Sequence, residues 1–311
     1  YWSDRLKSSF LRCRCLRRGQ SFGLRHKRRG EREQRRTERD GASGMVSSAP
    51  IGVFDSGIGG LTVVRELMKQ LPNESIIYFG DTGRLPYGPK SPDTVIRYSR
   101  EITEFLRGEG VKTIVVACNT ATAHALPTLR EENDLPVIGV IEPGSRAAAR
   151  ATQTGRVGVI GTQGTIHSRA YERAIANAAP DTKITALACP LFVPLVEEGW
   201  LDTEATRIIA REYLEPMAAS NVDTLVLGCT HYPLLKQVIG NVVGREVRLI
   251  DSAEETAAET ASTLRAAGIE RRKTDAAHYR FIASDAPEQF LRVGQRFLGS
   301  SIDRVETITF G

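Results

Sequence analysis

The sequence lacks any apolar run long enough to cross a membrane. Nowhere in its 311 residues is there a run approaching the roughly eighteen uninterrupted apolar residues that a spanning helix needs, and the start has no continuous apolar segment of the secretory type. Cysteine is also scarce: five are present, without a CxxC pair, which fits neither a disulfide framework nor a structural zinc site. We therefore expect a cytoplasmic protein with reduced thiols and no membrane partner.

The usual signatures of cofactor binding are missing as well. There is no GxxxxGK[ST] motif, and the glycine run 57–62 lacks the last glycine of a dinucleotide fingerprint. No lysine after residue 44 falls at the carboxyl end of an expected strand, where a pyridoxal enzyme would need one. Cys229 and His231 would require two further ligands, which the sequence does not supply, to hold a metal. We expect neither a cofactor nor a metal.

The composition, with 41% hydrophobic and 25% charged residues, is that of a globular protein with a real core. Its net charge of +5 is concentrated at the start: residues 1–44 hold 14 basic and 5 acidic residues, whereas the remainder holds 28 and 32. Because residues 1–44 show no apolar periodicity, we expect a disordered basic tail that is not native, with Met45 as the natural start. A basic arm that touches nucleic acid is the alternative, and we do not expect a nucleic-acid partner.

From residue 50 onward, short β-branched apolar runs alternate with segments of helical period. These runs lack the polar alternation of half-exposed strands, which is typical of parallel sheets covered by helices on both faces. The expected strands span 50–54, 75–79, 113–117, 136–140, 156–160, 183–187, 224–228 and 247–250. The pattern predicts an α/β fold of doubly wound type.

The chain also repeats itself. The segment 111–118 recurs as 222–229 at an offset of 111 residues. Two flanking strands recur in the same order, 51–54 as 157–160 and 139–142 as 248–251, at offsets of 106 and 109 residues. We therefore expect two similar parallel-sheet domains related by pseudo-twofold symmetry, with the active site between them.

The repeat sets the expected domain bounds. The first domain would comprise residues 45–143 plus 253–311, and the second residues 144–252. A final strand at 279–283 and a helix at 287–298 are expected to pack back on the first domain.

Each half carries one cysteine at the end of the equivalent strand, Cys118 and Cys229. Ligands of open parallel sheets bind at these carboxyl ends, so the two thiols would face one ligand from opposite sides. A thiol titrates near pH 8.5 and is a usable acid or base, and a helix N-terminus is expected to lower that pKa. Such a pair suits a racemase or epimerase, with proton removal on one face and return on the other. Two small buried side chains are the alternative.

Three further groups stand near these ends. Asp55 precedes a glycine turn and is interpreted either as a catalytic acid or base or as a cap of the next helix. His231 could tune the thiol of Cys229 or shuttle its proton, or be structural. Glu197 follows a proline-containing apolar stretch and would be a supporting acid or a solvated side chain. Cys189 is interpreted as structural.

Five motifs in order carry a resemblance. They are VFDSGIGGLT with Asp55 and Ser56, YFGDTGRLPYG with Asp81, Tyr87 and Gly88, VACNTA with Cys118, Asn119 and Thr120, FVPLVE with Glu197, and GCTHYP with Cys229, Thr230 and His231. From about residue 51 to the end, the sequence resembles the bacterial glutamate racemases of the aspartate/glutamate racemase family.

The resemblance implies cofactor-independent interconversion of L- and D-glutamate, supplying D-glutamate for peptidoglycan synthesis, cell wall biogenesis and cell shape. By the family's motifs, Cys118 and Cys229 would be the bases, serving D- and L-glutamate respectively, assisted by Asp55, Glu197 and His231. The substrate-binding residues would be Asp55, Ser56, Tyr87, Gly88, Asn119, Thr120, Thr230 and His231. Aspartate racemisation, or a cysteine hydrolase using Cys229, is the alternative; a homodimer is left open.

Overall fold

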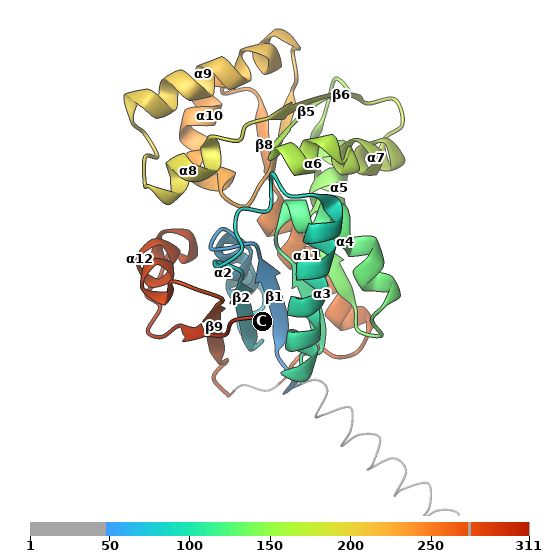
Figure 1. The fold of residues 1–311 in the computed structure, drawn as a ribbon. Helices are drawn as coiled ribbons and strands as arrows, with labels where there is room; N and C mark the ends of the chain where they lie inside the picture. The colour runs from blue at the N-terminus through green and yellow to red at the C-terminus, as the bar shows by residue number, and fades with distance from the viewer. Residues whose placement is uncertain (1–47, 273–274, 311) are drawn as a thin grey trace, which may run out of the picture. The chain divides into compact units, whose positions relative to one another are not determined.

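Two parallel sheets form the framework of the residues that the computed structural model describes, which are 48–272 and 275–310. One sheet has the strand order β10-β9-β2-β1-β3-β4 and the other the order β6-β5-β7-β8. Figure 1 shows the strands with the helices around them. The predicted α/β class with two parallel sheets is confirmed. The expected tail, residues 1–44, lies outside the described residues.

The strands lie close to where the sequence places them. They are β1 Ile51–Asp55, β2 Ile76–Gly80, β3 Thr113–Val116, β4 Val137–Gly139, β5 Arg156–Gly161, β6 Lys183–Ala188, β7 Thr224–Gly228, β8 Arg248–Asp251, β9 Tyr279–Ala283 and β10 Glu306–Thr307. Strand β10 was not expected, because two polar residues carry no periodicity. It is defined only by its pairing with β9 at Ile282 and Ala283.

The helices connect these strands and cover the sheets. They are α2 Leu61–Gln70, α3 Pro92–Gly108, α4 Asn119–Glu131, α5 Ile141–Ala151, α6 Gln163–His167, α7 Ala170–Ala178, α8 Phe192–Glu197, α9 Glu204–Ala219, η1 Tyr232–Leu235 (a 3-10 helix), α10 Lys236–Val243, α11 Ser252–Ala266 and α12 Pro287–Leu298. In α3, Ser91 caps the first turn and the buried residues Val95, Ile102 and Leu106 form one stripe.

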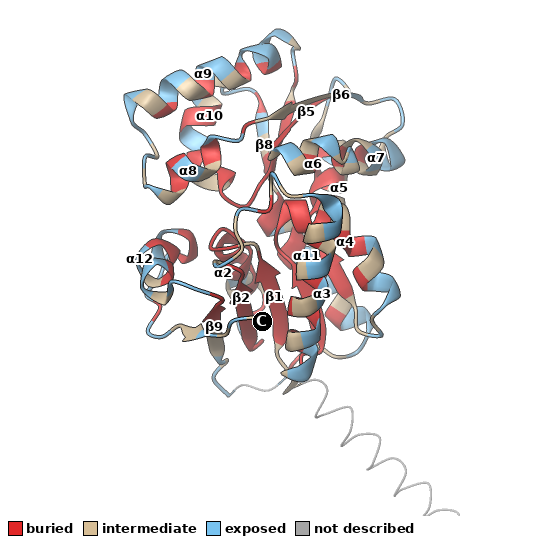
Figure 2. Ribbon diagram, viewed as in Figure 1, coloured by how far each residue is buried: buried red, intermediate tan, exposed pale blue. Residues whose placement is uncertain are grey.

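The two sheets have the same internal strand order, which agrees with the sequence repeat. In the first sheet β1 lies between β2 and β3, and β4 follows β3; in the second, β5 lies between β6 and β7, and β8 follows β7. The central strands β1, β3 and β7 are buried along their whole length. Figure 2 shows β1 in red, whereas α9 carries red, tan and blue residues, as expected for a helix with one buried face.

The chain returns to the first sheet after α11. Strand β9 pairs in parallel with β2, from Ile76 opposite Tyr279 to Gly80 opposite Ala283, and Phe290 of α12 packs against Tyr78 with ring centroids 5.9 Å apart. The expected return of the final strand and helix is therefore confirmed. Among the described helices, none is long and apolar enough to cross a membrane.

Candidate active site

The thiols of Cys118 and Cys229 line one cavity of about 40 Å³, which we name the inner cavity. Cys118 lies two residues beyond the end of β3, and Cys229 directly follows β7. Both side chains are buried, with 6% exposure each. The ends of two equivalent strands, one from each sheet, thus bring the two thiols together.

Most of the predicted site residues lie in the same place. The inner cavity is lined by ten of them: Ser56, Tyr87, Gly88, Cys118, Asn119, Thr120, Glu197, Cys229, Thr230 and His231. Asp55 is fully buried and does not line the cavity.

Thr162 lines the cavity but was not singled out from the sequence. Its hydroxyl lies 2.8 Å from that of Thr120. The sequence repeat could have indicated it, because the offset of 106 residues that relates β1 to β5 makes Thr162 the counterpart of Ser56.

Asp55 lies at the end of β1 with its carboxylate turned into the glycine turn. Its Oδ2 accepts a hydrogen bond of 2.9 Å from the N–H of Gly57, while Oδ1 is buried without a partner. Burial raises the pKa of Asp55, and the charge of His231 opposes that shift. The capping alternative is not supported, because the N-cap of α2 is Gly60 and no side chain caps it.

Cys118 is the N-cap of α4, where its Sγ accepts a hydrogen bond of 3.4 Å from the N–H of Ala121. Burial nevertheless raises the pKa of Cys118 to about 12, and the nearby charge of Asp55 adds to this rise. The N–H of Ala121 and the hydroxyl of Ser56 act in the opposite direction. The expectation of a lowered pKa at Cys118 is therefore wrong in net direction, because desolvation outweighs the helix terminus.

Cys229 belongs to a chain of three side chains. Its Sγ lies 3.8 Å from Nδ1 of His231, whose Nε2 lies 3.0 Å from Oε1 of Glu197. Burial alone would lower the pKa of His231, but its hydrogen bonds with Cys229 and Glu197 raise that pKa to about 10. The ring of Phe297, from α12, packs edge-on against the imidazole at 5.2 Å. This environment favours an imidazolium beside the thiol.

The two thiols lie before different kinds of helix. An α-helix begins directly after Cys118, as expected, whereas Cys229 is followed by the 3-10 helix η1 and only then by α10. The expected helix N-terminus is therefore absent at Cys229, where His231 supplies the nearby positive charge instead.

Asp81 does not line the inner cavity but binds a residue that does, Tyr87. It is fully buried and accepts hydrogen bonds from the hydroxyls of Tyr87 and Ser284, the latter at 2.8 Å, and from Nε of Arg84 at 2.8 Å. The sequence placed Asp81 at a strand end without a role. Through these contacts Asp81 connects Tyr87, in the cavity wall, with Ser284, which directly follows β9.

Cys189, the third buried cysteine, does not line the inner cavity. Its carbonyl accepts a hydrogen bond of 2.8 Å from the hydroxyl of Tyr232. Among the described residues, no group of three or more histidine, cysteine or acidic side chains is placed to hold a metal ion.

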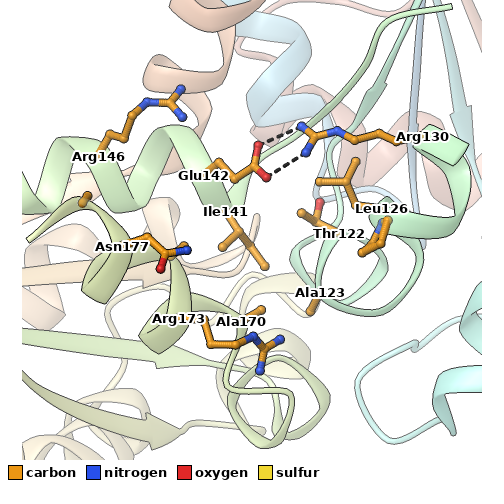
Figure 3. A pocket seen from close by; sticks show the side chains of 13 residues that line it. Thr122, Ala123, Leu126, Arg130, Ile141, Glu142, Arg146, Ala170, Arg173 and Asn177 are labelled. Carbon is orange, nitrogen blue, oxygen red and sulfur yellow. Dashed lines mark hydrogen bonds and ion pairs between the residues drawn. The ribbon is translucent and has the colours of Figure 1, made fainter. Parts of the chain in front are cut away.

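A larger cavity of about 400 Å³ lies between α4, α5 and α7 (Figure 3). Arg130 and Glu142 form a two-pronged ion pair across it, at 2.7 and 2.8 Å. No thiol or imidazole lines it. Size alone therefore does not identify the reacting site, and the chemistry favours the inner cavity.

Two thiols at equivalent strand ends, both lining one cavity, can remove a proton from one face of a carbon atom and return a proton to the other face. The sequence profile of the Asp/Glu/hydantoin racemase family matches residues 51–260. The chain belongs to this family, and it is an isomerase that acts on amino acids.

Within the family the similarity is to glutamate racemases. The chain is 55% identical over 259 residues to glutamate racemase of Geobacter metallireducens, covering 83% of this chain and 96% of that one. Its structure is similar to that of a glutamate racemase isoform from Bacillus anthracis, with a TM-score of 0.82, 43% identity and coverage of 84% and 98%. The Francisella tularensis glutamate racemase in complex with D-glutamate gives a TM-score of 0.80, 39% identity and coverage of 85% and 98%.

Proposed function

We propose that this enzyme interconverts L- and D-glutamate without a cofactor, with Cys118 and Cys229 as the two bases. The observation that carries the proposal is the pair of buried thiols at the ends of β3 and β7, both lining the inner cavity. Glutamate rather than aspartate is supported by the similarity to glutamate racemases. A hydrolase using Cys229 would leave Cys118 in the same cavity without a role.

In the proposed reaction, one cysteine is a thiolate and the other a thiol. The thiolate of Cys229 removes the α-proton of L-glutamate, and the thiol of Cys118 returns a proton to the opposite face. Cys229 is then protonated and Cys118 is not, so the enzyme is ready for the reverse reaction. His231, held by Glu197, stabilises the thiolate of Cys229, and Asp55 assists on the side of Cys118.

Two buried polar atoms without protein partners support the way the substrate is bound. Nδ2 of Asn119, which lines the cavity, is an unused donor suited to a carboxylate. Oδ1 of Asp55 is an unused acceptor suited to the α-ammonium; it is buried outside the cavity lining, and the ammonium would reach it only when the cavity walls move apart. Tyr171 donates a hydrogen bond of 2.7 Å to Oδ1 of Asn119 and so fixes the direction of that donor. An ammonium near Asp55 would also offset the charge that raises the pKa of Cys118.

The remaining predicted residues would complete the substrate site. The hydroxyls of Ser56, Thr120 and Thr230, with Tyr87 and Gly88, are suited to hold the two carboxylates. The inner cavity measures about 40 Å³ and is lined by residues from the strand ends of both sheets. In this proposal its walls move apart when glutamate enters.

We also propose the setting of the reaction. Residues 45–143 plus 253–311 and residues 144–252 would be the two domains, a division supported by the membership of the two sheets. The enzyme would work in the cytoplasm, where D-glutamate enters peptidoglycan synthesis.

Circular dichroism of L-glutamate and L-aspartate solutions with purified enzyme tests this function. We expect loss of the glutamate signal, little change with aspartate, and the same rate after dialysis against a chelator or treatment with a carbonyl reagent. Loss of activity on either treatment, restored by metal or pyridoxal phosphate, would contradict the proposal.

A further inference from the structure

A second cavity lies directly outside the inner cavity and shares Gly88 with it. It has a volume of about 490 Å³ and lies between the loop that leads into α3 and the helices α4, α6 and α7. We name it the outer pocket and define it by Gly88, Lys90, His124, His167 and Arg173. Apart from Gly88, the proposed reaction makes no use of these residues.

Only a thin partition separates the two spaces. The N–H of Gly164 donates a hydrogen bond of 2.9 Å to the carbonyl of Gly88, and the hydroxyls of Thr120 and Thr162 meet at 2.8 Å. A Cβ at Gly164 would lie 2.7 Å from the Gly88 oxygen, so the two backbones touch without a side chain between them. Such a contact can separate without repacking a hydrophobic core.

Helix α4 connects the two spaces. Thr120 lines the inner cavity and His124 lines the outer pocket. Residues four apart lie on the same face of an α-helix, about one turn from each other. A molecule in the outer pocket is therefore one helical turn from the inner cavity.

The outer pocket is suited to an anion. Lys90 and Arg173 contribute positive charge, His124 and His167 contribute imidazoles, and none of the eleven lining residues is acidic. Arg173 is held in place by a hydrogen bond of 2.7 Å to the carbonyl of Ser168. Arg173 also lines the cavity in Figure 3, but that cavity contains the carboxylate of Glu142, which pairs with Arg130.

We propose that the outer pocket is an anion-binding site that holds a carboxylate of glutamate before the substrate crosses into the inner cavity. This step rests on the proposed function. In the proposed binding step the walls of the inner cavity move apart, and movement at this partition would admit a substrate that the outer pocket has already bound. Clefts lined by one sign of charge raise the local concentration of an oppositely charged ligand.

Stopped-flow fluorescence with racemic glutamate tests this step in the full chain. Racemic glutamate is at chemical equilibrium, so the signal reports binding and not turnover. We expect the double variant Lys90→Gln/Arg173→Gln to lower both the association and the dissociation rate constants about five- to tenfold at low salt. The dissociation constant of glutamate should change less than about twofold, because the outer pocket lowers the barrier to entry and exit and makes no contact with glutamate in the final complex. At about 0.5 M salt the difference should disappear.

Two comparisons make the test specific. Lys183→Gln removes one charge at the amino end of β6, away from the strand ends that form the site, and should leave both rate constants unchanged. The exchange Lys90→Arg/Arg173→Lys keeps both charges and should retain fast binding.

Unchanged association in the double variant, an equal fall in Lys183→Gln, or a fall in association without one in dissociation would each overturn the outer pocket as an entry site. The circular dichroism assay separates this from a failure of the proposed function. A wild-type chain that does not racemise glutamate overturns both proposals, whereas normal racemisation with unchanged association overturns only the outer pocket.

Discussion

Cys118 and Cys229 are equally buried, yet their neighbours differ in charge. Asp55 lies on the side of Cys118 and raises its pKa, whereas His231 lies beside Cys229. The sequence repeat places the two thiols at equivalent positions of the two sheets, but these neighbours give them different electrostatic environments. The substrate's ammonium group would reduce that difference when it binds near Asp55.

Removing either thiol should abolish racemisation in both directions, because a base without a partner acid cannot complete the inversion. We expect Cys118→Ala and Cys229→Ala each to lower kcat by at least about a thousandfold, the upper part of the range for a general acid or base, while glutamate still binds. The measurement is circular dichroism from both enantiomers. Cys189→Ala, which removes a buried thiol outside the inner cavity, is the matched control. Near-normal racemisation by Cys118→Ala would exclude the two-base mechanism.

The pair formed by Glu197 and His231 should determine the alkaline limit of activity. Glu197 helps to raise the pKa of His231 to about 10. In Glu197→Gln this contribution is lost, the folded-state pKa falls, and the imidazolium loses its proton at lower pH. We therefore expect the alkaline limb of kcat/KM for L-glutamate to move to lower pH, measured as pH–rate profiles in both directions. Glu198→Gln, an exposed neighbour, should leave the profile unchanged; an identical shift in that variant would refute the assignment.

At the scale of elements, the turn between β1 and α2 is the tightest part of the site. A Cβ at Gly60 would lie 2.5 Å from the Cβ of Asp55 and 3.0 Å from the hydroxyl oxygen of Tyr78. The glycine therefore lets the helix begin close behind the Asp55 carboxylate. A glycine is required at this position for lack of space and not for its backbone conformation, because any residue can adopt the φ of −60° found at Gly60.

Gly60→Ala should displace Asp55 and overpack the turn. We expect a loss of about 1–3 kcal/mol in the free energy of unfolding, together with a fall in kcat, measured by urea denaturation and by the racemisation assay. Gly108→Ala, at the last residue of α3, is the matched control, since nothing lies within 4 Å of the added Cβ. It should stabilise by up to about 1 kcal/mol. Equal effects in both variants would contradict the close approach at Gly60.

At the scale of the whole molecule, a buried ion pair next to the first sheet binds the segment that connects α11 with β9. Nζ of Lys112 lies 2.6 Å from Oε2 of Glu74 and donates to the carbonyl of Ile269 at 2.8 Å. Oε1 of Glu74 accepts a hydrogen bond of 2.7 Å from the N–H of Arg271. These contacts hold the segment between α11 and β9, by which the chain comes back from the second sheet.

Lys112→Met should leave a buried carboxylate without its cation. We expect a loss of about 3–5 kcal/mol in the free energy of unfolding, measured by urea denaturation, with racemisation retained at low temperature because the inner cavity is not involved. Arg100→Met, which breaks an ion pair with Glu132 on the surface, should shift the transition far less. A small effect of Lys112→Met would mean that this segment is held by its apolar contacts alone.

The sequence by itself determined the α/β class, the first nine strands and ten of the residues that line the inner cavity. Apolar periodicity and the repeat predicted the class and the strands, and the binding of ligands at the ends of parallel strands singled out Cys118 and Cys229. The substrate-binding residues were indicated by the family motifs. Only the tertiary structure decided how far each titratable group is buried and in which direction its pKa is shifted. Desolvation, which the neighbouring chain segments create, raises the pKa of Cys118 and overrides its helix terminus. Three further contacts also depend on the tertiary structure. Glu197 pairs with His231, and the carbonyl of Gly88 accepts a hydrogen bond from Gly164, in each case between residues far apart in the sequence. The hydrogen bond from Tyr87 to Asp81 depends on the direction of both side chains, which no local sequence pattern encodes.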